Sequence, residues 1–429
     1  MATLEQPLLR RTLSGREVTH QGESYIRFHD EAGTFDEPVL VPTAWYQLLL
    51  RAFDGSATLQ DHQARVLTET GTFVPLERLG SIVADLDRAL LLEGPTLERY
   101  LEEYRSSRLR PAHLAGRSYA GTAKALRAQI GAIFGDPDPL DAAASPGESV
   151  EDSASPSLRG IVSPHIDFQR GGHVYGHAYR ELIERSDAEI FVIIGVAHKL
   201  CRRRFALTYK DFETPLGLAK TDRGFVDRMV EVAGDDFFDD EIAHRAEHSI
   251  EFQVVMLQFL LGDRRPFSIV PILVGSFHDL MPSGQDPKSD PQVARMIEAL
   301  RAAENDCGSR VCYIGGIDLC HVGPEFGDAD PVHDSLLTEL RDFDARMLEH
   351  AGRGDAPSWF REAAAIGNRY RVCGLAAGYT LLEAMGPTRG RLLRYDQSVD
   401  PARRCCVTVA GVAHYLRDPV ESAHEARPR

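Results

Sequence analysis

The sequence predicts an α/β protein whose larger domain is a three-layer sandwich with a mixed, mainly parallel β-sheet. After residue 158, short runs of apolar and β-branched residues alternate with segments of helical periodicity. These runs lack polar alternation, which is typical of strands buried on both faces of a sheet. Before residue 136 the pattern is mostly helical, and a change of composition separates the two regions.

Residues 1–135 are predicted to form a small helical domain, similar to a winged-helix domain. Apolar residues recur at spacings of three and four in four segments, 43–53, 58–70, 75–94 and 95–107. Thr58 followed by Asp61 matches a helix-capping pair. The stretch 52–93 resembles the recognition domains that accompany radical-SAM peptide-modifying enzymes, which implies peptide or partner binding. A domain that simply packs on the rest of the chain is the alternative.

Two segments have compositions that do not support a hydrophobic core. Residues 136–158 are rich in Pro, Ser, Ala and acidic side chains, and we interpret them as a flexible linker. Residues 418–429 are predicted to be a disordered tail. The larger domain is therefore expected to span residues 159–417.

Within the larger domain, predicted strands and helices alternate along the chain. The apolar runs predict strands over residues 160–164, 189–197, 267–276, 310–318 and 404–413. Segments with an apolar stripe predict helices over residues 172–186, 249–262, 290–304, 335–351 and 373–386. Cys373 opens the last of these helices, and we interpret it as a packing residue.

The composition excludes several classes of function. A formal net charge of −16 argues against a nucleic-acid groove or a polybasic membrane patch. No apolar run approaches the roughly 20 residues of a membrane helix, and the N-terminus lacks the core of a secretion signal. Seven irregularly spaced cysteines do not suggest a disulfide framework. We expect a cytoplasmic protein with reduced thiols, and its excess of Arg over Lys suggests a bacterial source.

Potential metal ligands follow three of the predicted strands, at the point where each strand ends. His165 follows the first strand, His198 the second, and Asp318, Cys320 and His321 the fourth. The carboxyl ends of strands in an open α/β sheet form the crevice where ligands bind. Imidazole and thiolate groups from rigid elements are suited to hold one ion. The sequence therefore predicts a metal site at this edge of the sheet.

The motif His244-x-x-Glu247-His248 supports a second interpretation. It matches the inverted zinc-protease pattern, in which two histidines on one helix bind zinc and the glutamate activates water. That interpretation requires the whole motif to form one continuous helix. Ser249 is instead a suitable N-cap for a helix that begins at Ile250, which would place His248 in or beside a loop. A longer helix is not excluded by the local sequence, so the protease remains an alternative.

Six segments of the larger domain carry a family resemblance. They are SPHIDFQRGGHVYGHAYREL, VIIGVAHK, ETPLGLAKTD, AHRAEHSIEFQVVMLQFL, IVPILVGS and DLCHVG. In this order and spacing they resemble the Memo family, including the bacterial members called AmmeMemoRadiSam system protein B. The resemblance covers about residues 159–416. It implies a fold similar to class III extradiol dioxygenases, whose non-haem iron lies at the carboxyl ends of the sheet.

The resemblance also implies a ligand set. Two histidines and a cysteine would hold one mononuclear metal ion, and these residues match His165, His198 and Cys320. Related dioxygenases have a carboxylate where this set has a cysteine, so the site is softer and suits iron, with copper or zinc as alternatives. The same change puts ring cleavage in doubt. Asp318 is either the missing carboxylate or a partner of a ligand.

For the reaction, the resemblance implies that His248 is the general acid or base, assisted by Glu247, Asp318 and His321. The expected function is that of a non-haem metal-dependent oxidoreductase, similar to a dioxygenase, acting on a small or peptide-borne substrate. The alternative from a different class is a non-catalytic module that binds a peptide or partner and works with a radical-SAM protein. The inverted zinc protease is the third interpretation.

Overall fold

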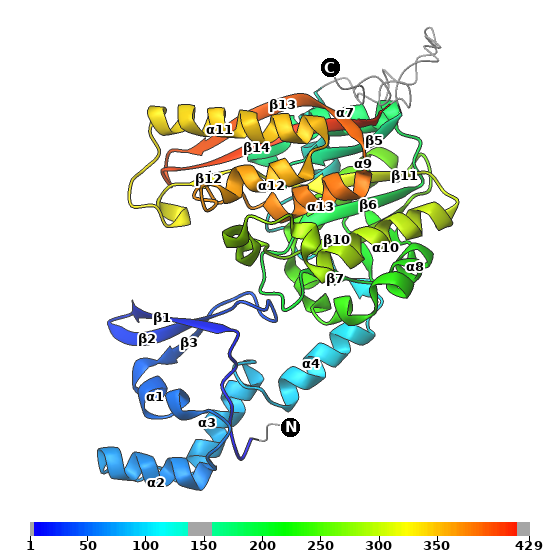
Figure 1. Cartoon of the computed structure of the whole chain (residues 1–429). Coiled ribbons are helices and arrows are strands. Elements are labelled where there is room, and N and C mark those ends of the chain that lie inside the picture. Colours follow the sequence, from blue (N-terminus) through cyan, green and yellow to red (C-terminus); the bar gives the residue numbers. More distant parts are fainter. Residues whose placement is uncertain (1–3, 136–156, 418–429) are drawn as a thin grey trace. The chain divides into compact units, whose positions relative to one another are not determined.

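The computed structural model describes residues 4–135 and 157–417 (Figure 1). The chain divides into two compact units, of which the first ends at Arg108 and the second begins at Leu109. Of the predicted linker, only its last two residues are described, and the predicted tail lies wholly outside the described residues. None of the helices in the described ranges combines the length and hydropathy that a membrane crossing requires.

The first unit contains an antiparallel sheet as well as the expected helices. Its strands pair in the order β1 (Leu13–His20), β2 (Glu23–Asp30) and β3 (Val39–Pro42). Its helices are α1 (Thr43–Leu48), α2 (Leu59–Thr70), α3 (Leu76–Arg88) and α4 (Pro95–Ser106). The helical prediction is confirmed, but the sheet was not predicted. The reason is that β1 buries none of its residues and so carries no apolar alternation.

Local signals in the first unit behave as expected from the sequence. Thr58 accepts a hydrogen bond from the backbone N–H of Asp61, and Asp61 accepts one from the backbone N–H of Thr58. This reciprocal cap starts α2. A buried ion pair between Arg10 and Asp30, 3.0 Å apart, ties the chain before β1 to the end of β2.

The second unit is built on a mixed sheet with a parallel centre. Its five central strands are parallel to one another and follow the order β5 (Leu158–Ser163), β11 (Val311–Gly316), β6 (Ile190–Val196), β10 (Ser268–Val274) and β9 (Gly217–Thr221). The remaining strands are β4 (Leu109–Arg110), β7 (Phe205–Leu207), β8 (Asp211–Thr214), β12 (His321–Val322), β13 (Thr388–Asp400) and β14 (Cys405–Leu416). All five predicted strands are therefore present.

Helices cover both faces of this sheet, so the predicted three-layer sandwich is confirmed (Figure 1). One face carries α5 (Ala123–Phe134), α7 (Phe168–Arg185) and α9 (His248–Leu261). The other carries α8 (Arg223–Ala233), α10 (Pro291–Cys307), α11 (Asp334–Arg353), α12 (Ala356–Ala364) and α13 (Leu375–Met385). The short 3-10 helices are η1 (Leu50–Ala52), η2 (Asp236–Phe238), η3 (Glu241–Ala246), η4 (His278–Ser283), η5 (Pro287–Ser289) and η6 (Pro324–Phe326).

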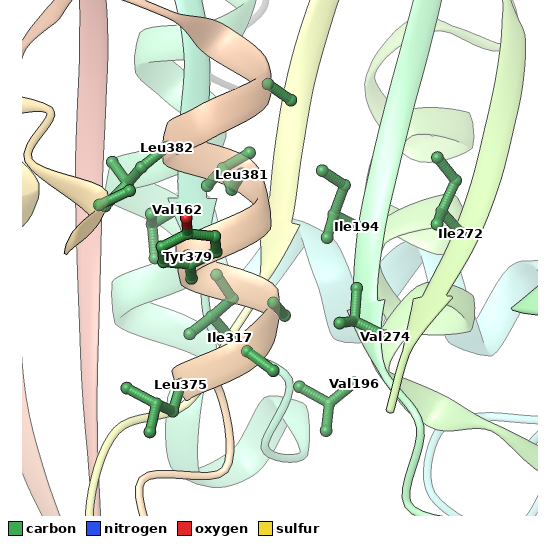
Figure 2. Close-up of a cluster of buried hydrophobic side chains, with 14 of the residues drawn as sticks. Val162, Ile194, Val196, Ile272, Val274, Ile317, Leu375, Tyr379, Leu381 and Leu382 are labelled. Carbon is green, nitrogen blue, oxygen red and sulfur yellow. The ribbon is translucent and has the colours of Figure 1, made fainter. Parts of the chain in front are cut away.

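Side chains of the buried strands alternate between the two faces of the sheet and contribute to two hydrophobic cores. In β6, Val192 and Ile194 belong to the core on one face, whereas Phe191 and Ile193 belong to the core on the other face. Figure 2 shows side chains of α13 beside Val162 and Ile194 of the sheet, with labelled members Leu375, Tyr379, Leu381 and Leu382. Cores on both faces hold the central strands rigidly, and their carboxyl ends become a fixed platform.

The boundary between the units differs from the predicted one. Residues 109–135 belong to the second unit, although the N-terminal domain was expected to extend to residue 135. β4 pairs with β8, and the apolar stripe of α5, formed by Leu126, Ile130 and Phe134, joins the same core as α7 and α9. The change of composition at residue 136 therefore lies inside the second unit, not between the two units.

Candidate metal centre

Three histidine side chains converge at the carboxyl ends of β5 and β6. His165 follows β5, His198 follows β6, and His248 is the first residue of α9. One ligand nitrogen from each ring lies within 4.8 Å of those from the other two. The ring centroids are 4.5 to 5.2 Å apart. Three distant parts of the sequence thus supply imidazoles to one spot.

Two glycines allow the first turn of α9 to approach the sheet so closely. A Cβ on Gly195 would lie 2.6 Å from Ser249 Oγ, and one on Gly316 would lie 2.4 Å from the Ser249 carbonyl oxygen. Ser249 Oγ donates to the carbonyl oxygen of Val196 at 2.9 Å. Any side chain at either glycine would push the helix away from the strand ends, and His248 with it.

Glu247, not Ser249, is the N-cap of α9. Its Oε1 accepts hydrogen bonds from the backbone N–H groups of His248 and Ser249, at 2.8 and 3.0 Å. The same oxygen lies 3.0 Å from His198 Nδ1 and 3.1 Å from His248 Nδ1. Burial opposes ionisation, but the two imidazoles outweigh it and hold the pKa of Glu247 well below its usual range. One buried carboxylate therefore orients two of the three rings.

The hydrogen bonds of the rings leave one nitrogen of each available for an ion. His165 Nδ1 lies 2.8 Å from the Gly316 carbonyl oxygen and therefore carries the proton it donates. The carboxylate of Glu247 likewise takes Nδ1–H of His198 and of His248. In each ring Nε2 is the nitrogen that these contacts do not use, the arrangement usual where a carboxylate or carbonyl oxygen orients a metal-binding histidine. The donor set fits a transition-metal ion.

The protonation states of two rings follow from their surroundings. Burial lowers the pKa of His165 to about 3, so this ring is neutral near pH 7 and ready to bind a metal. Burial also acts to lower the pKa of His198, but the charge of Glu247 outweighs it, and the net shift is upward. A proton on His198 would therefore compete with a metal ion.

Asp318 fixes the end of β5. Its Oδ1 accepts hydrogen bonds from the backbone N–H groups of His165 and Ile166, at 2.8 and 3.3 Å. Its Oδ2 lies 3.6 Å from His165 Nε2. The carboxylate, which is almost completely buried, thus stands beside the ligand nitrogen and holds the backbone that carries it.

The structure does not bring Cys320 to the three histidines, which corrects its expected place among the ligands. Cys320 is buried, and its Sγ donates to Asp344 Oδ1 on α11, at 3.2 Å. Its backbone N–H donates to Thr408 Oγ1 on β14. The segment after β11 runs beside β14, and this pairing directs the thiol towards α11 instead of towards His165.

Cys373 is the cysteine that the structure places at the histidines. Its Sγ lies 3.3 Å from His165 Nε2 and 3.7 Å from the Asp318 carbonyl oxygen. A Cβ on the next residue, Gly374, would lie 2.0 Å from a methyl carbon of Ile317, so only glycine permits this approach. Burial raises the pKa of Cys373 well above its usual range. Cys373 was expected to be a packing residue, so its contact with His165 was not predicted. The Cys373-Gly374 pair at the start of a buried helix was the sequence feature that could have indicated this close approach.

Two other histidines of the sequence analysis lie outside this cluster. His321 packs its ring against Phe326, with centroids 5.0 Å apart, and its Nδ1 lies 3.1 Å from the Leu319 carbonyl oxygen. Burial lowers the pKa of His321. His244 is buried in η3, where its Nε2 lies 2.9 Å from the Ala206 carbonyl oxygen.

The zinc-protease motif does not form the continuous helix that its function requires. η3 ends at Ala246, Glu247 adopts an extended conformation with φ −78° and ψ 131°, and α9 begins at His248. His244 and His248 therefore belong to different elements. Glu247 is already engaged by two imidazoles instead of being directed at a water molecule.

Comparison with known proteins identifies the family. The model of the family described as Memo-like protein matches residues 110–413. The chain belongs to the Memo family. The match begins within β4, at Arg110, so the Memo domain and the second unit start at almost the same residue.

Curated Memo proteins are similar over most of the chain. A MEMO1 family protein of Aquifex aeolicus is 28% identical over 385 residues, covering 86% of this chain and 90% of the relative. One of Thermus thermophilus is 28% identical over 340 residues, covering 79% and 93%. The solved structure of an uncharacterized protein from Escherichia coli K12 has a TM-score of 0.34 and 12% identity, covering 60% of this chain and 99% of that one.

Arg110, at the start of the Memo domain, holds the backbone on which the site depends. Its side chain is fully buried, and Nε donates to the His244 carbonyl oxygen and Nη2 to that of Glu247, both at 2.9 Å. Nη1 pairs with Glu251, which also accepts from the hydroxyl of Tyr119. The guanidinium thus fixes the turn that presents Glu247 to the histidines.

A cavity of about 370 Å³ opens beside the Memo histidines. His198 and Cys373 form part of its wall, together with residues from the carboxyl ends of β6 and β10 and from the segment before α13. Pockets for small molecules usually fall in this range of volume, and in open α/β sheets they lie at the carboxyl ends of strands. The cavity can therefore admit a small ligand next to His198 and Cys373.

Proposed function

We propose that this Memo protein binds one mononuclear metal ion and uses it in an oxidoreductase reaction on a small or peptide-borne substrate. The observation that carries the proposal is the convergence of His165, His198 and His248, with one ligand nitrogen of each within 4.8 Å of the others. Nε2 of each ring is the proposed ligand atom, and Cys373 is the sulfur donor beside His165.

Iron is the metal we propose, with copper and zinc as the alternatives that the same donors accept. Bound iron would supply oxygen-dependent or electron-transfer chemistry. The protein's own part is to orient the ligand rings, through Glu247 on one side and the Gly316 carbonyl oxygen on the other. Asp318 Oδ2 lies 3.6 Å from His165 Nε2, and its proposed role is to accept a proton at this edge of the site.

His248 has one free nitrogen for two proposed roles. Because Nδ1 is engaged by Glu247, only Nε2 can either bind the ion or transfer a proton. The acid or base role expected from the sequence therefore remains a prediction that competes with ligation. His321, whose ring packs against Phe326, is proposed only as an assisting residue.

Metal quantitation after anaerobic purification tests the proposal. We expect about one ion per chain in the wild type, and almost none in His165→Ala and His198→Ala. His29→Ala, an exposed histidine of the first unit, is the control and should keep full occupancy. Equal metal content in the wild type and all of these variants would contradict the proposed metal centre. Loss of metal in His248→Ala assigns it as a ligand, whereas full occupancy with lost turnover assigns it as the acid or base.

The alternative function is that of a non-catalytic module, which binds a peptide or a partner protein without turnover. In this alternative the partner is a radical-SAM protein. Oxygen consumption by the metal-loaded protein, screened against small molecules and modified peptides, separates the two. An enzyme consumes oxygen or oxidises a substrate in proportion to its metal content, whereas a module binds a peptide with no turnover at any metal content.

A further inference from the structure

The cavity beside His198 has a distinct distribution of charge. Its lining residues include Arg371, His198 and His278, and none of the described residues that line it is acidic. The whole chain carries a formal net charge of −16. A wall without acidic groups is therefore a local feature of this cavity, and it disfavours a cationic ligand.

Arg371 is fixed in place and still has an unused edge. Nη1 and Nη2 both donate to the carboxylate of Asp328, and Nη1 also donates to the His321 carbonyl oxygen, at 3.3 Å. In the described part of the chain, Nε donates to no acceptor, and Nη2 donates only to Asp328. Nε–H and the second hydrogen of Nη2 form the side edge of the guanidinium, which matches a carboxylate with two parallel hydrogen bonds.

The backbone around Arg371 is held in an unfavourable conformation. Asn368 and Arg371 have φ of +50° and +53°, in the left-handed region that residues other than glycine rarely adopt. The side chain of Asn368 stabilises this turn, because its Oδ1 accepts from the backbone N–H of Val372 at 2.9 Å. Such strain persists where the surroundings enforce it, often at ligand sites. Here it presents Arg371 and Cys373 to the same cavity.

The rest of the wall is mostly apolar. Val196, Val274 and Leu375 line the cavity between the polar groups, and Phe277 and Met281 complete this surface. Figure 2 shows Val196 and Val274, where β6 and β10 end, on the same side as Leu375, where α13 begins. A ligand therefore meets an apolar surface, one guanidinium edge, and the side chains of His198 and Cys373.

We propose that this cavity binds a small carboxylic acid with an apolar body. The carboxylate would take the side edge of Arg371, and the body would contact Val196, Val274 and Leu375. That arrangement leaves the reacting part of the molecule beside His198. The inference rests on the proposed function for the reaction at that end, but the binding preference itself requires no metal.

Three probes with one skeleton test the preference in metal-free protein. We would measure the binding of 3-phenylpropanoate, 3-phenylpropanamide and 3-phenylpropylamine by calorimetry after chelator treatment, so that no carboxylate can bind through the ion. The carboxylate should bind at least tenfold more tightly than the amide, and the amine most weakly. Equal affinity for the three, or no binding of the carboxylate, would overturn the inference.

Two variants place the carboxylate and the body. Arg371→Gln should lower the affinity for the carboxylate to that of the amide and leave the amide unchanged. Arg369→Gln is the matched control, because this neighbouring arginine is more exposed, pairs with Glu339, and does not line the cavity. Met281→Trp, which fills the cavity, should weaken the carboxylate and the amide alike. Circular dichroism and thermal unfolding establish that each variant is folded.

The outcomes separate this inference from the metal proposal. If the protein holds no metal but binds the carboxylate preferentially through Arg371, the carboxylate inference is supported and the metal proposal is contradicted. If the protein holds metal, but Arg371→Gln binds the carboxylate as tightly as the wild type does, the metal proposal is supported and the carboxylate inference is contradicted. Undiminished binding to Met281→Trp would also count against the inference, because the probe would then lie elsewhere.

Discussion

Two cysteines of the second unit lie in opposite chemical surroundings. Cys320 stands in a closed network in which its thiol and the hydroxyl of Tyr395 both donate to Asp344. Cys373 stands at an open cavity, with its sulfur 3.3 Å from a histidine nitrogen that has no other hydrogen bond in the described residues. The first thiol is satisfied by a carboxylate, whereas the second is available to an ion or a substrate.

This contrast shows that position in a motif is weaker evidence than direction in space. Cys320 lies two residues from Asp318 and next to His321, so its sequence neighbours suggest a ligand. The pairing of its segment with β14 turns its side chain towards α11. Cys373 has no such neighbours, yet a glycine and a strained turn bring it to His165.

Replacing each cysteine in turn gives the largest expected difference. Cys373→Ser should lower metal affinity on the order of 100-fold or more, since loss of a partner that only supports a ligand already costs about 10–100-fold. Cys320→Ser should leave metal affinity unchanged. Competition with a chromogenic chelator measures both. A large loss in Cys320→Ser with none in Cys373→Ser would restore the ligand set expected from the sequence.

Glu247→Gln should have the next largest effect and should act on the histidine region alone. The neutral amide cannot hold the Nδ1 protons of His198 and His248 as the carboxylate does, so metal affinity should fall about 10–100-fold. The spectrum of the cobalt-substituted protein should change as well. An unchanged spectrum with full affinity would mean that Glu247 only caps α9.

The Cys320 region should instead control how stability depends on pH. Burial raises the pKa of Asp344 from 3.8 to about 6, although its hydrogen bonds act in the opposite direction. Between pH 4 and 6 the folded protein therefore binds more protons at this group than the unfolded chain does. Its contribution to the free energy of unfolding should fall by about 3 kcal/mol as the pH rises through this window.

Asp344→Asn should remove that slope without changing metal content. Urea unfolding of the second unit at pH 4.5 and pH 7 measures the slope in the variant and in the wild type. Relative to the wild type, the variant should have a higher free energy of unfolding at pH 7 than at pH 4.5. A constant difference would mean that Asp344 is ionised throughout.

Tyr395→Phe should have the smallest effect. The variant loses one hydrogen bond to Asp344 and should lower the free energy of unfolding at pH 7 by about 1 kcal/mol. Losing this donor should also shift the pH transition of Asp344 upwards, with metal content unchanged. A drop in metal content would instead show that the regions around Cys320 and Cys373 act as a single site.

The fold was predictable because its signals are local. The five apolar runs and the five apolar stripes correspond to observed strands and helices, and the cap at Thr58 formed as expected. The sheet of the first unit was missed because β1 is largely exposed and buries none of its residues. The boundary was displaced because a change in composition does not show that α5 packs on α7.

The site was predictable only in part, for a geometric reason. His165 and His198 were placed by the rule that strand ends share one edge of a sheet, and the structure brings them together. Their roles as ligands remain a prediction. His248 joined them because Gly195 and Gly316 let α9 approach, and Cys373 because Gly374 lets its turn approach Ile317. Sequence spacing does not reveal such steric permissions between distant segments.

The buried guanidinium at the start of the Memo domain limits where the chain can be cut. A fragment that began at residue 159, after the acidic stretch, would contain every histidine of the cluster and still lack Arg110, Tyr119 and α5. Glu251, which is fully buried, would remain as an uncompensated negative charge, at a cost of about 3–5 kcal/mol. The smallest piece able to hold its imidazoles in place therefore begins at or before Leu109.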